Sequence, residues 1–209
     1  LPPSRSHSSS AMCGANGDSS VSARTAEEVI RQAADSEQIA VTTGIVEHVH
    51  LVPAYVGLGA PHWDPDARGA ILGLSRDTTG AEIVTATLQA VAYQTRDLIR
   101  AMADDGIEPR ILRVDGGMVG NEWLLQFLAD ILGIEVERPK MIESTVLGAA
   151  CLAALAGGLI GSTGVLAELW QRDALFRPAM EPARRERLYA GWLEAVARVR
   201  TTPPEERPQ

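Results

Sequence analysis

The sequence has almost no lysine. Its 209 residues include 19 lysines and arginines, and Lys140 is the one lysine among them. A Walker A loop needs a Gly-Lys-Ser/Thr run around phosphates, and a protein kinase needs a lysine on an early strand, whereas Lys140 lies between proline and methionine. The sequence therefore excludes both classes of nucleotide site. Any contact with phosphate would depend on backbone N–H groups, arginines, a helix N-terminus or a bound metal.

Cysteine and positive charge are also scarce. Cys13 and Cys151 cannot form a disulfide framework or a Cys-rich zinc site, and such usage is typical of a reducing compartment. With a net charge of −8, the chain lacks the positive electrostatic field that non-specific nucleic-acid binding requires. The apolar run Val146–Ile160 is shorter than the roughly 20 residues that span a bilayer. We expect a cytoplasmic location, no nucleic-acid partner and no membrane span.

The chain divides by composition into three parts. Residues 1–22 are rich in serine and poor in large apolar side chains, which predicts a disordered tail. Because the first residue is Leu1 rather than Met, we interpret this tail as a fragment end or as the product of a displaced start site. Residues 23–200 have the composition of a globular domain, and we expect 201–209 to be a flexible tail.

Hydrophobic periodicity predicts helices alternating with strands. The expected helices cover residues 25–38, 81–103, 121–132, 144–160 and 182–200. The expected strands cover 46–55, 70–74, 111–114 and 134–137, the last ending before Pro139. This alternation indicates an α/β fold with a largely parallel sheet. Helix 144–160 is almost wholly apolar, so we expect it to be buried.

A glycine turn follows the strand at 111–114. It reads Asp115-Gly116-Gly117 and leads into a helix that starts near Asn121. Glycines let a ligand approach the backbone, and free N–H groups at a helix start favour an anion or a nucleotide edge. An ordinary strand-to-helix turn explains the same residues, with Asn121 as the helix N-cap.

Other polar residues give weaker signals. His48 and His50 lie two apart on an expected strand and share a face, but no third metal ligand lies nearby, which favours a packing role. Asp64, Asp66 and Arg68 lie in a loop, where a carboxylate and the guanidinium form either a loop-ordering ion pair or part of a site. Cys151 is expected to pack as a small hydrophobe. We predict no metal site.

Five ordered stretches resemble the C-terminal half of glycerol kinases, members of the FGGY family of carbohydrate kinases. The stretches are Val52–Gly69, Gly69–Gln89, Ala92–Asp97, Arg113–Gly117 and Glu143–Ala150. The resemblance covers roughly residues 40–195. It implies the C-terminal lobe of a ribonuclease-H-like fold, of the type found in actin, Hsp70 and hexokinase, incomplete at its N-terminal edge. Helix 144–160 would then connect to the interlobe hinge.

The resemblance also implies a function. Asp115, Gly116, Gly117 and Asn121 would form the adenosine turn for ATP or ADP, with Mg²⁺ held mainly by phosphates, water and the other lobe. The family reaction is ATP-dependent phosphorylation of glycerol to glycerol 3-phosphate. The N-terminal lobe supplies the polyol pocket and the general base, so we assign no catalytic residue here and expect this chain to be inactive alone.

Alternatives remain open beside this interpretation. The chain could be a truncated nucleotide-binding module without catalysis, or a kinase fragment for another short polyol or sugar. Glycerol is a partner only where an N-terminal lobe is present. Assembly of the chain as a homo-oligomer is a further possibility that the sequence leaves open.

Overall fold

The computed structural model describes residues 35–164 and 170–201. The tail predicted at 1–22, the Thr25 cap of the first predicted helix and residues 202–209 lie outside this part. The helices are α1 (Asp35–Thr43), α2 (Gly80–Asp104), α3 (Glu122–Leu132), α4 (Ser144–Ala156) and α6 (Pro182–Val199), with a short 3₁₀ helix, η3 (Gly117–Gly120). The strands are β1 (His50–Val52), β2 (Ala70–Leu72), β3 (Ile111–Arg113), β4 (Glu135–Pro139) and β5 (Arg172–Phe176).

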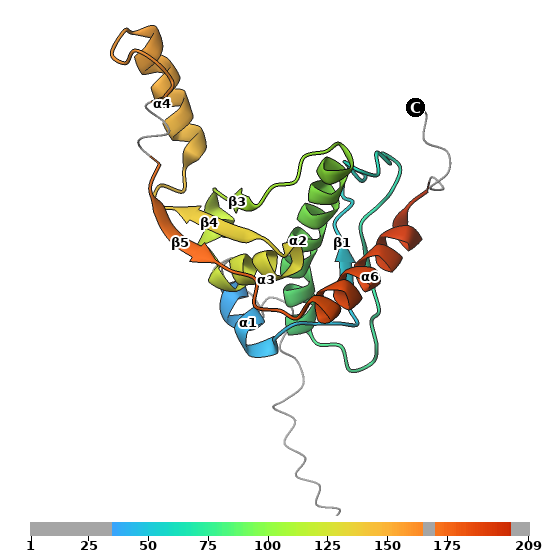
Figure 1. Cartoon of the computed structure of the whole chain (residues 1–209). Coiled ribbons are helices and arrows are strands. Elements are labelled where there is room, and N and C mark those ends of the chain that lie inside the picture. Colours follow the sequence, from blue (N-terminus) through green and yellow to red (C-terminus); the bar gives the residue numbers. More distant parts are fainter. Residues whose placement is uncertain (1–34, 165–169, 202–209) are drawn as a thin grey trace, which may run out of the picture.

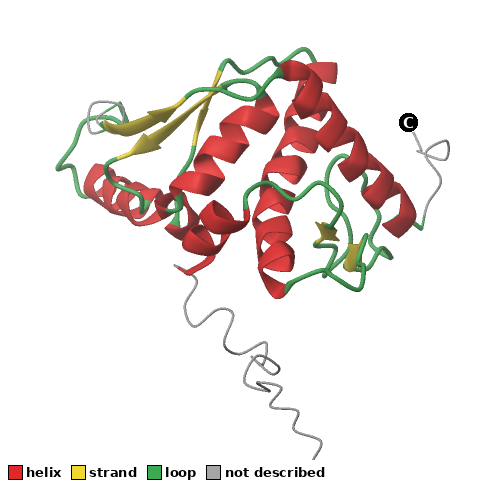
Figure 2. Cartoon of the chain, turned by 90° about the horizontal axis from the view of Figure 1, so that it is seen from below, coloured by secondary structure: helices red, strands yellow, loops and turns green. Residues whose placement is uncertain are grey.

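The strands form two small sheets at opposite ends of a helical layer (Figures 1 and 2). β1 pairs with β2 in antiparallel fashion, and the second sheet has the order β3-β4-β5. The prediction of a mixed α/β fold is confirmed, but the prediction of a largely parallel sheet is wrong. Only β3 and β4 pair in parallel among the described strands, because α3 carries the chain across the sheet between them. After β4 the chain leaves the body through α4 (Figure 1), and β5 then pairs with β4 in antiparallel fashion.

The core lies where α2, α3 and α6 meet. The ring of Tyr93 stacks on Trp192 with centroids 5.4 Å apart and meets the edge of Phe127 at 5.7 Å. These three residues come from the three helices, and each is at most 2% exposed. Aromatic packing of this kind adds stability beyond the area that it buries. It fixes α2 against α3, and both Leu88 of α2 and the start of α3 border the candidate site described below.

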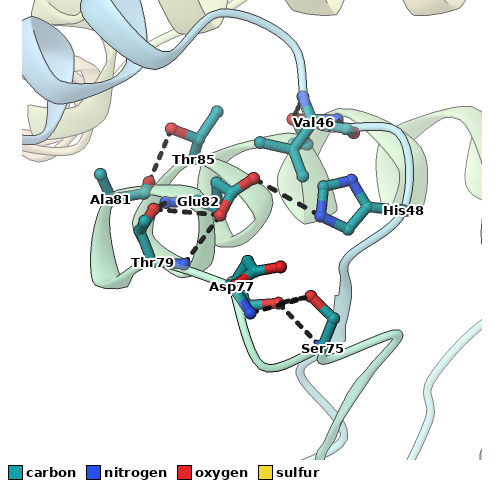
Figure 3. A network of polar contacts seen from close by, with 10 residues as sticks. Val46, His48, Ser75, Asp77, Thr79, Ala81, Glu82 and Thr85 are labelled. Atoms are coloured by element: carbon teal, nitrogen blue, oxygen red, sulfur yellow. Dashed lines mark hydrogen bonds and ion pairs between the residues drawn. The ribbon is translucent and has the colours of Figure 1, made fainter.

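Helix α2 begins with a capping box, shown in Figure 3. Glu82 N donates to Thr79 Oγ1 at 3.3 Å, and Thr79 N donates to Glu82 Oε2 at 2.7 Å. Each side chain thus satisfies a backbone donor that the first turn leaves free. The hydrogen bonds from Thr79 lower the pKa of the Glu82 carboxyl.

The buried face of α2 differs in part from the expected apolar stripe. Leu88 is buried as predicted, whereas Leu98 is 45% exposed. Polar side chains occupy buried positions instead, because they have specific partners: Gln89 receives a hydrogen bond from Val46 N and donates to Val46 O, at 2.8 and 2.9 Å. The spacing of hydrophobic residues could not identify buried polar positions such as this one, because it takes no account of the hydrogen-bond partners that a polar side chain finds in the fold.

Helix α3 agrees with its prediction at both ends. Asn121 is the N-cap, and Gly133 closes the helix in the left-handed conformation with φ of +73°. Strand β4 runs past its predicted end to Pro139. Proline is tolerated there because the register shifts between Arg138 and Pro139, at an irregular end of the strand.

The boundaries of several other elements differ from their predictions. Helix α1 extends beyond Gln38 to Thr43 and β1 has three residues, fewer than the alternating pattern from Val46 to Tyr55 predicts. Helix α4 ends at Ala156, four residues before the predicted end. The sequence analysis missed β5, whose first residues are exposed and charged.

The predicted burial of α4 is wrong for the described structure. Val146 and Leu152 are 65% and 61% exposed, and Cys151 is the buried residue of this helix. The helix projects from the body of the molecule in Figure 1, so its apolar side chains have little described surface to pack against. Cys151 is buried as a free thiol, in agreement with its prediction. No helix in residues 35–164 or 170–201 is long and apolar enough to cross a membrane.

Candidate functional site

The turn after β3 has the predicted strand, glycine turn and helix order, with η3 inserted between the glycines and α3. Gly116 adopts φ of +89°, a conformation that favours glycine, and its N–H donates to Ile142 O at 2.8 Å. Gly117 opens η3, and Asn121 follows it as the N-cap of α3. The chain therefore leaves the sheet after Val114, turns at Gly116 and reaches α3 through one tight 3₁₀ turn.

A cavity of about 650 Å³ lies beside this turn. Its described lining comes from three parts of the chain that are distant in sequence. Ser36 and Glu37 belong to α1, Leu88 belongs to α2, and the others belong to the turn. The turn residues in the lining are Gly117, Met118, Gly120 and Asn121. A Cβ atom built on Gly117 or Gly120 would meet no atom within 4 Å. The two glycines thus leave the backbone open beside the cavity, as a site for a closely bound ligand requires.

The four predicted nucleotide-binding residues do not all share this cavity. Gly117 and Asn121 line it, and Gly116 precedes them in the turn. Asp115 lines a second cavity of about 600 Å³, with Lys140, Ser144 and Trp170 among its other residues. The structure thus places Gly117 and Asn121 at one cavity and Asp115 at the other.

The N-terminus of α3 is already capped by two side chains. Asn121 Oδ1 accepts from Leu124 N, and Glu37 Oε1 accepts from Glu122 N, both at 2.8 Å. The interpretation of Asn121 as an N-cap is therefore confirmed. The carboxylate of Glu37 takes the place where an anion would meet the helix dipole, and a phosphate there would be repelled. This end of the cavity suits the uncharged part of a ligand.

Arg138 binds both η3 and the first turn of α3. Its Nη1 donates to Val119 O at 3.2 Å, and its Nη2 donates to Glu122 Oε1 at 3.1 Å. The same guanidinium binds Asp173 on β5, with Nη2 2.7 Å from Oδ2. One arginine thus connects η3, the first turn of α3 and the neighbouring strand. The sequence analysis missed both Arg138 and Glu37, because their contacts join segments far apart in the chain.

The two histidines considered as metal ligands have different environments. His50 packs 6.3 Å from the Tyr93 ring, and burial lowers the pKa of its imidazole. His48 lies outside β1 and is 3.4 Å from Glu82 (Figure 3). In the ranges that the structure covers, no group of three or more His, Cys, Asp or Glu side chains could hold a metal ion. The geometry of His50 is that of a packing residue.

Asp64 orders the loop between β1 and β2. It is buried, and it accepts hydrogen bonds from Ala67 N at 3.1 Å and from Thr201 Oγ1 at 2.7 Å. Arg68 donates to the carbonyl oxygens of Pro65 and Ala67. Both side chains thus order this loop, and the partners that Arg68 binds there are carbonyl oxygens in place of the carboxylate that the sequence suggested.

Comparison with known proteins identifies the family. A model of the C-terminal domain of the FGGY family of carbohydrate kinases matches residues 11–157. The chain belongs to this family. The ribonuclease-H-like fold that the resemblance implied is the fold of this domain, and the resemblance to glycerol kinases is confirmed.

The curated relatives include several bacterial glycerol kinases. The chain is 58% identical over 175 residues to glycerol kinase of Ectopseudomonas mendocina and 56% identical over 171 residues to that of Rhodospirillum rubrum. These alignments cover 83% and 81% of this chain but 35% and 34% of the relatives. The chain thus spans about a third of the length of these FGGY kinases.

Solved structures of two kinases share the fold. The Plasmodium falciparum glycerol kinase, crystallised with ADP, superposes with a TM-score of 0.72 and 33% identity, over 85% of this chain and 36% of that one. A gluconate kinase from Lactobacillus acidophilus gives a TM-score of 0.69 at 22% identity, over 86% of this chain and 37% of that one. The second similarity concerns the fold alone.

Proposed function

We propose that this chain is the nucleotide-binding C-terminal lobe of a glycerol kinase. With an N-terminal lobe it would transfer phosphate from ATP to glycerol and give glycerol 3-phosphate. The observation that carries the proposal is the cavity beside the Gly117–Asn121 turn, with its bare glycine backbone, in a chain 58% identical to a glycerol kinase. The glycerol kinase structure with ADP supports the choice of an adenine nucleotide.

The described residues divide the binding task among themselves. Gly117 and Asn121 contact the nucleoside end, and Gly116 supplies the backbone turn that presents them. Asp115 begins the turn, where we expect it to order the loop. Leu88 and Met118 provide apolar surface for a flat base, as sites for small ligands commonly do. In this assignment all four predicted residues belong to the turn, and two of them, Gly117 and Asn121, line the cavity that holds the nucleoside.

Mg²⁺ would neutralise charge on the transferring phosphate when it is bound. The fold family implies this ion, yet the described residues offer no cluster of acidic side chains for it. We therefore assign its ligands to the phosphates, water and the N-terminal lobe. Phosphoryl transfer also needs the acceptor hydroxyl, a base and the γ-phosphate in line. We assign no catalytic residue to this chain, so the chain alone binds nucleotide without turning over.

The exposed apolar side chains of α4 support a further role in assembly. Val146 and Leu152 are exposed apolar side chains, which are costly to leave in water. We infer that this helix packs against another lobe or a second copy of the chain. The cytoplasm is the proposed compartment, in agreement with the scarcity of cysteine.

Calorimetric titration of the chain with ADP tests the proposal, beside an assay of glycerol-dependent ADP release from ATP and Mg²⁺. We expect saturable binding of one ADP per chain and no release above a glycerol-free blank. Failure to bind ADP at millimolar concentration would contradict the assignment of the cavity. Glycerol-dependent release would contradict the claim that the catalytic groups lie elsewhere.

A further inference from the structure

Two side chains present opposite hydrogen-bonding groups to the same cavity. Glu37 comes from α1 and Asn121 from the start of α3, and both line the 650 Å³ hollow. One oxygen of each side chain already accepts a hydrogen bond from the N-terminus of α3: Glu37 Oε1 accepts from Glu122 N, and Asn121 Oδ1 accepts from Leu124 N. These two backbone N–H groups therefore determine which polar atom of each side chain remains available to a ligand.

The remaining atoms have opposite character. The free end of Asn121 is its Nδ2 group, which only donates, and the free end of Glu37 is Oε2, which only accepts. Within the described part of the chain neither atom has a hydrogen-bond partner. The cavity thus offers a ligand one donor and one acceptor whose identities cannot exchange, since flipping the Asn121 amide would turn an N–H group against Leu124 N.

This pair distinguishes the purine bases. Adenine carries its 6-amino donor beside the N7 acceptor, whereas guanine carries two acceptors, O6 and N7, along the same edge. Asn121 Nδ2 can donate to N7 of either base. Glu37 Oε2 can accept from the 6-amino group of adenine, but it would face O6 of guanine oxygen to oxygen. We propose that Glu37 selects adenine over guanine at this site, with Asn121 as the donor that orients the base.

The charge of the cavity agrees with this orientation. The described residues of its lining include no lysine or arginine, and Glu37 brings a carboxylate to the N-terminal end of α3. Phosphates are repelled there, so the base end of a nucleotide is the part that fits. The apolar side chains of Leu88 and Met118 complete a surface for a flat ring. This inference rests on the proposed function and adds to it Glu37 as the residue that distinguishes adenine from guanine.

The substitution Glu37→Gln tests the proposal with little change in shape. Glu122 N–H still needs an acceptor, so it holds the glutamine carbonyl and turns the glutamine amide toward the base. An acceptor for the 6-amino group then becomes a donor for O6. We expect the ratio of ADP to GDP affinity to fall by about tenfold or more, in the range that one well-placed polar pair discriminates.

The experiment titrates ADP and GDP into the full chain, its Glu37→Gln variant and Glu181→Gln. Glu181 is exposed at the start of α6, so Glu181→Gln makes the same charge change away from the cavity and should keep the wild-type ratio. Denaturation midpoints of all three proteins check that folding is unchanged.

The outcomes separate this inference from the proposed function. Wild-type preference for ADP with an unchanged ratio in Glu37→Gln would overturn the role of Glu37 and leave nucleotide binding intact. An equal loss of ADP and GDP affinity would also overturn it, because Glu37 would then position the turn without reading the base. Absence of binding to the wild-type chain would contradict the proposed function and the inference together.

Discussion

Replacing Asp97 by alanine is expected to lower the free energy of unfolding by about 3 kcal/mol, because it removes a buried charged acceptor of two hydrogen bonds. Asp97 lies on α2 and is 5% exposed. It accepts from Tyr189 Oη and, at 2.8 Å, from Trp192 Nε1, both on α6. Burial raises the pKa of the Tyr189 hydroxyl, so this group stays protonated and continues to donate. Alanine would leave both donors buried without an acceptor.

Urea denaturation of three variants measures this effect. Asp97→Asn keeps one acceptor and should lose less stability than Asp97→Ala. Asp104→Ala changes an exposed carboxylate on the same helix and should stay within about 0.5 kcal/mol of wild type. If Asp97→Ala and Asp104→Ala unfolded at the same urea concentration, the Asp97 contacts would not be what holds α6 to α2.

Gly117→Val is expected to weaken ADP binding by about tenfold or more while the fold is retained, because a branched side chain would fill space that a bound ligand uses. A Cβ at Gly117 meets no atom within 4 Å, and the backbone there lies outside the left-handed region. Valine therefore costs the free chain little. Calorimetric titration of wild type and variant with ADP gives the affinity ratio.

The control for this variant is Gly59→Val. Gly59 lies in the loop between β1 and β2, away from the cavity, and it also has open space around a Cβ. Its ADP affinity should match that of wild type. Equal affinities for Gly117→Val and wild type would show that the nucleotide does not approach this turn.

Local sequence signals predicted the centre of the site. Asn121 and Gly133 marked the two ends of α3, because a side-chain cap and a left-handed glycine are properties of single positions. The Asp115-Gly116-Gly117 run marked the turn for the same reason. The aliphatic stripe of a long helix also located α2, although polar partners changed which residues it buries.

Long-range contacts set the limits of the sequence analysis. Glu37 caps a helix 85 positions further along the chain, and no local pattern indicates such a pairing. Arg138 looks like an ordinary charged residue before a proline, yet it connects three elements around η3. The apolar sequence of α4 predicted burial, but burial also needs a facing surface, which composition cannot supply.

Hydrogen exchange of the chain with and without saturating ADP tests the central claim most directly, since it reports where the nucleotide binds. We predict slower exchange in α1 and from Gly117 to Leu124, the segments that surround the 650 Å³ cavity. Exchange around Lys140 and Ser144, beside the second cavity, should change little. Protection confined to that second region would contradict the assignment of the adenosine site to the Gly117–Asn121 turn.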